Sequence, residues 1–472
     1  MLTKPHQWNP WALLPLLAGV YWLLAAQGGL WLTLGLVPAT LMIAGGASMF
    51  LWPGVDKTMQ FVSAGSALGV VVAIPLLFVN REALLAAALS AASFVVAGRM
   101  LIRQTRIVED VPPPQDKLSL WIKAALDDML LAYLSGTAHI PGGAAADRMC
   151  ADLKSAAETL AARGQLEDPA AYHRTPVAPG EVRLRARRAA GHDFEELQFN
   201  SGYQPDLELP GAERHLSYRN NAEAAAWLFR RGADDAAPER PWLICIHGYR
   251  MGVHWQDFGL YRPAWLHERL RLNLMMPVLP LHGPRREGWR SGDAYLDHNF
   301  ADMLHTHAQA LWDIRRCIAW VRQQQPDARI GLLGFSLGGY TTALVAQYEA
   351  ELDFAVACIP ATDFASTLWR QVPPEHQRYY RERGVDENFL RAVMAPVSPL
   401  SSPPLLSRDR CHIVAGVADR VVPPVEALKL AQHWQTPVHW YQGGHLSFRR
   451  EPVVRETIEN AMRAAGWAIP SA

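Results

Sequence analysis

The sequence predicts a mostly parallel, doubly wound α/β domain that follows a region of membrane-spanning helices. Three observations lead to this prediction. Long apolar runs fill the first hundred residues, and from about residue 181 strand-like runs alternate with amphipathic helical runs. A G-x-S-x-G pentapeptide, Gly334–Gly338, stands where one of these strands gives way to a helix. A chain of 472 residues is long enough for two or three such parts.

The apolar runs predict about four transmembrane helices within residues 1–106. The runs are Trp11–Ala26, Leu30–Leu51, Met59–Val79 and Ala83–Ile102. At ~1.5 Å per residue, the second and third runs reach ~30 Å, the thickness of a hydrocarbon core. The first run is short and the fourth carries Arg99 near its end, so three crossings and four crossings both stay open. A cleaved signal peptide would explain one run, not four.

Basic residues at the ends of these runs predict the orientation. Lys4 precedes the first run, Lys57 separates the second from the third, and the fourth ends in Arg99, Arg103 and Arg106. With four crossings these residues share one side, which the positive-inside rule assigns to the cytoplasm. We therefore expect a bacterial inner-membrane protein whose C-terminal domain faces the cytoplasm. Five scattered cysteines without a C-x-x-C pair agree with a reducing compartment and with ordinary buried thiols.

Residues 107–180 are expected to form a linker and a helical connector. The segment Val111–Pro114 has three consecutive prolines and predicts a stiff, extended spacer. Two helical patterns follow it, at about Lys117–Leu134 and Ala145–Arg163. The first of these presents a broad apolar stripe, as an amphipathic helix does.

Residues 181–472 are expected to form the α/β domain. The predicted strands are Ala224–Phe229, Trp242–Ile246, Met275–Leu281, Arg329–Leu333, Phe354–Ile359, Cys411–Gly416 and Val438–Tyr441. Helical stretches lie between them, for example Met303–Gln324, Thr341–Gln347 and Val425–Trp434. This alternation predicts right-handed crossovers and a mostly parallel sheet, whose functional groups gather at the carboxyl ends of the strands.

Ser336 is the predicted nucleophile. It is the serine of the G-x-S-x-G pentapeptide, with a buried-strand run before it and a helical run after it. A serine on such a strand-to-helix turn is held in strained backbone geometry at a helix N-terminus, and the flanking Gly334 and Gly338 let neighbouring segments pack closely.

With this serine motif between a strand and a helix, the sequence from about Ala224 to its C-terminus resembles the α/β-hydrolase superfamily. The resemblance implies a Ser–acid–His order along the chain. His445, in the run Gly-Gly-His-Leu-Ser after the last predicted strand, would be the base. Asp419, after the strand that begins at Cys411, would be the acid that orients it. Asp363, after the preceding strand, is the competing acid, because some members of the superfamily take their acid there.

The resemblance also implies an oxyanion hole. One donor would be the N–H of Leu337, the residue after the nucleophile. The second would be the N–H of Tyr249, because Leu243–Tyr249 matches the superfamily's strand-His-Gly pattern. In that pattern His247 is expected to brace its loop rather than to titrate in catalysis.

Two further stretches are expected to shape the site. Arg285, Arg286 and Arg290, on the loop after a strand, would either bind a phosphate or carboxylate or form a solvated charged loop. Residues 362–408 would form a small lid. Its larger apolar side chains would line an acyl pocket or hold the lid together: Phe364, Leu368, Trp369, Tyr379, Tyr380, Phe389 and Met394.

These patterns predict a membrane-anchored serine hydrolase that cleaves an ester through an acyl-enzyme, with lipids and other lipophilic esters as the candidate substrates. The alternatives are an acyltransferase or amidase with the same triad and a catalytically inactive membrane scaffold. No metal or organic cofactor is expected, since metal-ligand, phosphate-loop and dinucleotide motifs are missing from the sequence. A net charge of zero gives nucleic acid no bulk attraction. The substrate, the acyl acceptor and the oligomeric state stay open.

Overall fold

The computed structural model describes residues 9–52, 57–105, 107–230, 240–296 and 299–470. The chain divides into two compact units. We call the first, which comprises residues 1–137, 415–425 and 440–451, the helical unit. The second, residues 138–414, 426–439 and 452–472, is the sheet unit. Lys4 and Arg106, which entered the orientation argument, lie outside the described residues.

The helical unit folds the four apolar runs as helices. A short 3₁₀ turn, Pro10–Ala12, leads into the helices, which are α1 (Leu13–Leu24), α2 (Gly29–Leu51), α3 (Lys57–Leu76) and α4 (Glu82–Gln104). Helices α2, α3 and α4 are each long and apolar enough to cross a membrane, whereas the helical segment Pro10–Leu24 is shorter. The described part of this region therefore contains three helices of full membrane-spanning length and one short apolar helix.

Small residues let these helices approach one another. Gly65 of α3 lies against α2, where a Cβ atom would stand 2.7 Å from the Cβ of Leu41. Gly69, one turn later, lies against α4, where a Cβ atom would stand 2.6 Å from the Oγ of Ser90. The glycine pair four residues apart thus allows close packing on two neighbours, as small residues do between apolar helices.

The first connector helix, α5 (Leu118–Thr137), also belongs to the helical unit and packs on α3 and α4. Any side chain at Gly98 of α4 would collide with the backbone carbonyl of Trp121 in α5. Arg103, near the end of α4, pairs with Asp116 at 2.9 Å, and the indole N–H of Trp121 donates to the same carboxylate at 2.8 Å. Helix α5 is therefore fixed to the last apolar helix.

The sheet unit is built on nine strands in the order β1-β2-β3-β5-β4-β6-β7-β8-β9. Strands β5, β4, β6, β7 and β8 are parallel, whereas β1, β2, β3 and β5 pair antiparallel. The strands are β1 (Arg183–Ala189), β2 (His192–Asn200), β3 (Glu223–Phe229), β4 (Trp242–Ile246), β5 (Asn273–Pro277), β6 (Ile330–Phe335), β7 (Phe354–Cys358), β8 (Cys411–Gly416) and β9 (Val438–Tyr441). The mostly parallel sheet is confirmed.

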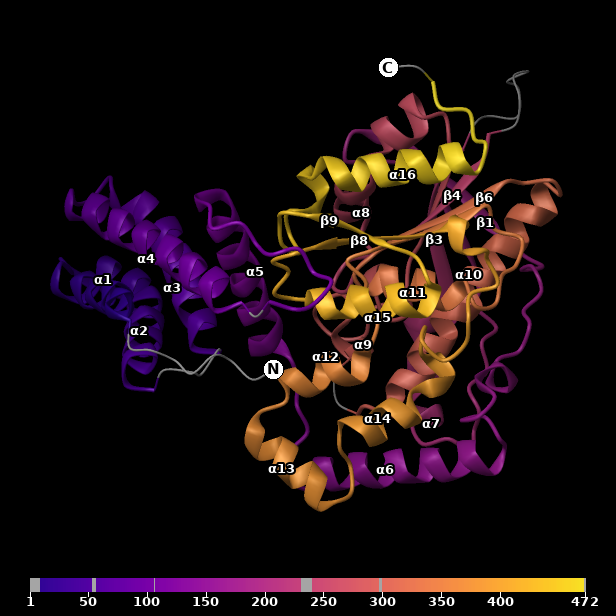
Figure 1. Ribbon diagram of the computed structural model, residues 1–472, viewed down its shortest axis with the longest axis horizontal. Helices are drawn as coiled ribbons and strands as arrows, with labels where there is room; N and C mark the ends of the chain where they lie inside the picture. The colour runs from indigo at the N-terminus through magenta and orange to yellow at the C-terminus, as the bar shows by residue number, and fades with distance from the viewer. Residues whose placement is uncertain (1–8, 53–56, 106, 231–239, 297–298, 471–472) are drawn as a thin grey trace. The chain divides into compact units, whose positions relative to one another are not determined.

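The central strands lie between two layers of helices. Every residue of β4, β6 and β7 is buried, as expected for parallel strands covered on both faces. Helices α8 and α16 lie on one face, and α10, α11 and α15 on the other (Figure 1). The helices after α5 are α6 (Gly143–Ala162), α7 (Ala212–Ser217), α8 (His254–Tyr261), α9 (Asp293–Leu296), α10 (Asp302–Gln324), α11 (Leu337–Val345), α12 (Phe364–Gln371), α13 (Pro374–Glu382), α14 (Glu387–Val393), α15 (Pro424–Trp434) and α16 (Pro452–Ala464).

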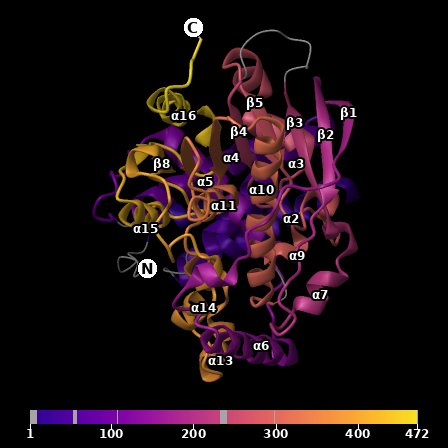
Figure 2. The same cartoon turned by 90° about the vertical axis from the view of Figure 1, so that its right-hand side faces the viewer.

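The predicted lid is a helical insert, α12 to α14, between β7 and β8. Helix α6 lies along α13 and α14 (Figures 1 and 2). The hydroxyl of Tyr380 donates to the carbonyl of Pro141 at 2.5 Å, and Arg383 pairs with Asp147 of α6. The second connector helix thus supports the insert from outside.

Candidate active site

Ser336 occupies the turn between β6 and α11, where the sequence predicts it. Its backbone dihedrals are φ 58° and ψ −115°, a conformation that costs a non-glycine residue about 1–3 kcal/mol. The Ser336 N–H donates to the carbonyl of Cys358 at 2.9 Å, and its own carbonyl accepts from the N–H of Tyr340 at 3.0 Å. Bonds to the next strand and to α11 therefore hold the strained turn in place.

Glycines make this turn possible. A Cβ atom at Gly334 would collide with the carbonyl of Gly338, and one at Gly338 would collide with the carbonyl of Ile246 in β4. A Cβ atom at Gly339 would stand 2.8 Å from the carbonyl of Cys358. The expected need for small residues around Ser336 is confirmed.

Two backbone segments meet near the Ser336 side chain. Leu337 is the first residue of α11, so its N–H has no acceptor within that helix and lies at the positive end of the helix dipole. The loop after β4 lies beside the serine, because a Cβ atom on Gly248 would be 3.7 Å from the Cβ of Ser336. Tyr249, the other expected oxyanion donor, is the next residue of that loop.

His247 holds this loop by both ring nitrogens. Its Nδ1 lies 2.8 Å from the carbonyl of Gly248, and its Nε2 lies 3.0 Å from the backbone N–H of Leu279. Nε2 must accept from that N–H, so Nδ1 carries the proton and donates to Gly248. Burial lowers the pKa of His247, which keeps the ring neutral. The bonding is that of a brace, as the sequence led us to expect.

Asp419 and His445 are brought together in the helical unit. Asp419 follows β8, His445 follows β9, and the Nδ1 of His445 lies 2.8 Å from the Oδ2 of Asp419. The other carboxylate oxygen of Asp419 accepts from the N–H groups of Val421 and Val422, at 3.0 and 2.8 Å. Asp419 and His445 are 4% and 7% exposed, so water competes little for this bond.

The pKa of His445 follows from these surroundings. Burial alone would lower it, since a buried imidazole loses the hydration of its charged form. The charge of Asp419, its hydrogen bond and the charge of Asp127 outweigh burial and raise the pKa of His445 above the ordinary value. The arrangement thus favours an imidazolium, the state that a general base reaches when it takes up a proton.

Asp127 of α5 was not foreseen at this place. It is fully buried, and it accepts hydrogen bonds from the backbone N–H groups of Arg420, His445 and Leu446, beside the Asp–His pair. The two residues are 318 positions apart in the chain, so no spacing rule connects them. The one signal in the sequence is the Asp127-Asp128 pair inside an amphipathic helix next to its apolar stripe.

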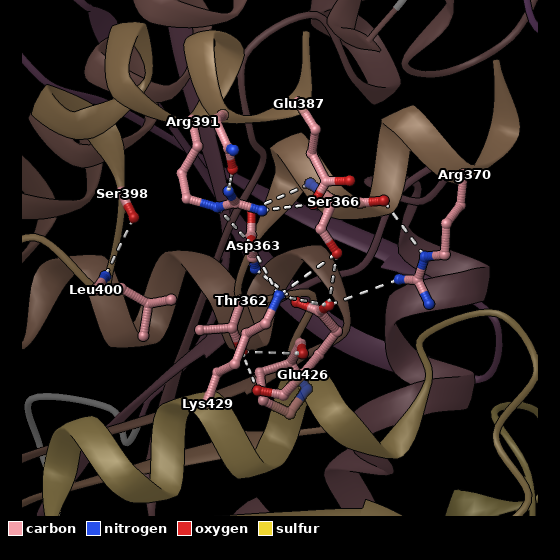
Figure 3. A network of polar contacts seen from close by, with 12 residues as sticks. Thr362, Asp363, Ser366, Arg370, Glu387, Arg391, Ser398, Leu400, Glu426 and Lys429 are labelled. Carbon is pink, nitrogen blue, oxygen red and sulfur yellow. Dashed lines mark hydrogen bonds and ion pairs between the residues drawn. The ribbon is translucent and has the colours of Figure 1, made fainter. Parts of the chain in front are cut away.

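Asp363, the competing acid, belongs to a separate ion cluster (Figure 3). It caps α12 by accepting from the N–H of Ser366 at 3.1 Å. Lys429 and Arg391 bind its second oxygen at 2.7 and 2.9 Å, and Lys429 also lies 3.2 Å from the buried Glu426. Burial would raise the pKa of Asp363, but the two cations and the cap bond lower it below the usual range. This is the bonding of a structural carboxylate.

Arg285 is not solvated, and the carboxylate that it binds belongs to the protein itself. Its guanidinium is buried, lies 2.7 Å from Asp313, and donates to the carbonyls of Val278 and Asn221, both at 2.9 Å. Arg285 therefore stabilises the fold from within. Arg286 and Arg290 are exposed. A loop's composition could not reveal which of its three arginines turns inward.

The insert's large apolar side chains mostly hold it together. Phe364, Trp369, Tyr380 and Met394 are buried, whereas Leu368, Tyr379 and Phe389 are half-buried. Phe364 packs on Tyr340 of α11, with ring centroids 4.7 Å apart. The first of these residues thus anchors the insert to the helix that starts at the nucleophile.

Known proteins that are similar to this chain identify its family. A model of the prolyl oligopeptidase family matches residues 291–452, the part that contains Ser336, Asp419 and His445. The uncharacterized protein MT2702 of Mycobacterium tuberculosis is 34% identical over 361 residues, which cover 76% of this chain and 85% of the relative.

Solved structures are similar at lower identity. An acetyl xylan esterase from Paenibacillus sp. R4 is 13% identical with a TM-score of 0.42, and the match covers 70% of this chain and 99% of the esterase. An acylaminoacyl peptidase of Pyrococcus horikoshii is 12% identical with a TM-score of 0.34, and the match covers 59% of this chain and 40% of the peptidase. From its sheet, its serine turn, the family model and its mycobacterial relative, this chain belongs to the α/β-hydrolase superfamily and, within it, to the family that includes MT2702.

Proposed function

We propose that this protein is a membrane-anchored serine hydrolase that cleaves an ester through an acyl-enzyme, with Ser336, His445 and Asp419 as its triad. The observation that carries the proposal is the position of Ser336, held in a strained turn at a helix N-terminus directly after a buried central strand. The buried bond between Asp419 and His445 supports it, because a serine at its free pKa needs an oriented base.

In the proposed reaction Ser336 Oγ attacks the ester carbonyl and His445 Nε2 takes up its proton. Asp419 accepts from Nδ1 and stabilises the imidazolium that forms. The N–H groups of Leu337 and Tyr249 bind the tetrahedral oxyanion, and the loss of one such donor typically costs about 10²–10³ in rate. His445 then returns the proton to the leaving alcohol, and a water molecule, activated in the same way, releases the acid from Ser336.

The helical unit contains a pocket that favours a lipophilic substrate. A pocket in this unit is lined by the end of α4, by the linker that follows and by the loop that carries Asp419. Most of the lining is apolar, for example Leu101, Val111, Val417 and Ala418. Peptide or amide cleavage is the second candidate, and the match to the prolyl oligopeptidase family favours it.

The test of this function uses the full chain in detergent micelles. A fluorophosphonate probe should label it covalently, because the probe needs the same activated serine as an ester. A panel of p-nitrophenyl esters, from acetyl to palmitoyl, is then compared with amino-acyl and peptidyl p-nitroanilides. We expect the higher kcat/KM with the esters. Labelling together with a preference for anilides would establish the peptidase instead, and failure to label would refute both.

We further propose four membrane crossings with a cytoplasmic sheet unit. At ~1.5 Å per residue, Pro10–Leu24 reaches only ~22 Å, so its crossing decides the topology. If this helix did not cross and the N-terminus lay in the cytoplasm, three crossings would carry Lys57, Arg99 and Arg103 across the membrane, against the positive-inside rule. Reporters fused after Ala472 and within Pro112–Pro114 should both behave as cytoplasmic. A clear periplasmic signal from both fusions would contradict this topology.

A further inference from the structure

Asp127 holds two separate loops by their backbones. Its Oδ2 accepts from the N–H of Arg420 at 3.2 Å and from the N–H of His445 at 2.5 Å, and its Oδ1 accepts from the N–H of Leu446 at 2.9 Å. Arg420 is the residue after Asp419. One carboxylate from α5 is therefore bonded both to the loop of the acid and to the loop of the histidine.

The fit around this carboxylate is tight. A Cβ atom at Gly444, the residue before His445, would collide with the Asp127 carboxylate. The side chain of Asp127 is fully buried, and in its ionised form it accepts stronger hydrogen bonds than a neutral carboxyl group would. The histidine loop approaches α5 this closely because residue 444 has no side chain.

The acid loop also rests on the apolar helices. Val417 and Ala418 belong to one buried apolar cluster together with Val62 of α3, Leu101 of α4 and Ala124 of α5. Asp128, the neighbour of Asp127, lies 3.5 Å from the hydroxyl of Ser63 in α3. The helical unit therefore does more than tether the chain, because its helices support the two loops of the Asp–His pair.

We infer that Asp127 is a positioning residue of the hydrolase: from the helix that follows the membrane region, it fixes the loop of Asp419 and the loop of His445 in register. This inference rests on the proposed function, since it presupposes that Asp419 and His445 serve Ser336. Such positioning matters because a displacement of ~1 Å at a catalytic group can cost about 10²-fold in rate.

Because Asp127 is ionisable, its positioning role can be recognised in the pH profile of kcat/KM. Burial and the charge of Asp419 raise the pKa of Asp127 to about 7, although His445 and the backbone N–H groups oppose them. The ionisable groups that act on the pKa of His445 are Asp419 and Asp127, and both raise it. The base must be neutral to act, so kcat/KM falls as the pH drops through this pKa. Removal of the Asp127 charge should therefore move the acid limb of the profile to lower pH.

The test is Asp127→Asn in the full chain. Asparagine has nearly the same size, but its amide group would face one of the three N–H donors that the carboxylate accepts. We expect kcat per labelled active site to fall about 10²-fold and the acid limb to shift downward. KM should change less than about twofold, because Asp127 is fully buried and its bonds go to backbone N–H groups. Asp302→Asn, a buried carboxylate of α10 that pairs with Arg214 in the sheet unit, is the control and should keep the wild-type pH profile.

A second variant disturbs the contact between Asp127 and the histidine loop by a change in the loop itself. Gly444→Ala should lower kcat as well, because its methyl group displaces the Asp127 carboxylate, whereas Gly180→Ala, with open space around it, should not. Wild-type kcat and an unmoved acid limb in both Asp127→Asn and Gly444→Ala would overturn the inference, as would a loss confined to the fraction of labelled sites. Absence of fluorophosphonate labelling in the wild-type protein would instead overturn the proposed function.

Discussion

Ser336→Ala should lower kcat for ester hydrolysis by about 10⁵–10⁶-fold, as loss of the nucleophile does in other serine hydrolases. The change removes one oxygen atom and adds no bulk, and the turn is held by backbone bonds, Ser336 N–H to Cys358 and Tyr340 N–H to Ser336. The fold and substrate binding should therefore survive. Activity is measured with the best ester of the panel, and stability by thermal unfolding.

Two further measurements sharpen this result. The double variant Ser336→Ala/His445→Ala should be no slower than Ser336→Ala alone, because members of a triad act as one unit. Ser407→Ala, an exposed serine before β8, should hydrolyse and label like the wild-type protein. If Ser336→Ala kept its labelling by the fluorophosphonate, the nucleophile would be another residue.

The central fold could be predicted from the sequence because each buried parallel strand is a short apolar run. Strands β4 and β8 begin and end at the predicted residues, and β6 and β7 differ by at most two. Strand β5 ends at Pro277, four residues before the predicted Leu281. The apolar run continues beyond the ladder through a turn in which Leu281 has a positive φ of 59°. Hydrophobicity there marked burial rather than strand pairing.

The edge strand β1 was not foreseen for the opposite reason. Its sequence, Arg-Leu-Arg-Ala-Arg-Arg-Ala, shows charge where an edge strand meets water, and six of its seven residues are exposed. Leu184 and Ala186 do alternate with arginines, but both are exposed, so this alternation marks no buried face of a strand. Charge on an edge strand is itself useful, because it discourages pairing with another chain.

In the candidate site, too, some residues could be recognised from a local sequence signal and others could not. Ser336, Asp419 and His445 each carry a local signal, namely the residues around them and their place after a strand. Arg285 carries no such signal, and Asp127 shows only its place in an amphipathic helix, because their partners lie far away in the chain: His445 for Asp127, Asn221 for Arg285. Contacts of this kind depend on the packed fold, and a single sequence does not encode them in any spacing.

Substitutions of Asp419 and Asp363 show which of the two is the acid of the triad. Asp419→Asn should lower kcat by about 10⁴-fold, the effect of the same change in a known triad. The structure gives the reason. The N–H groups of Val421 and Val422 both donate to Oδ1, so the amide oxygen of asparagine must stay there and its NH₂ must face His445. An NH₂ group donates to Nδ1, which places the ring proton on Nε2, and Nε2 can then no longer accept the proton of Ser336.

Asp363→Asn is the matched comparison, since Asp363 also follows a central strand and is 5% exposed. It should change kcat by less than about threefold, yet lower stability by about 1–3 kcal/mol, because Lys429 and Arg391 lose a charged partner within a buried cluster. The kcat values are taken per labelled active site, and stability comes from thermal unfolding. The opposite pattern, in which Asp363→Asn abolishes turnover and Asp419→Asn does not, would make Asp363 the acid. It would also leave the bond between Asp419 and His445 with a structural role alone.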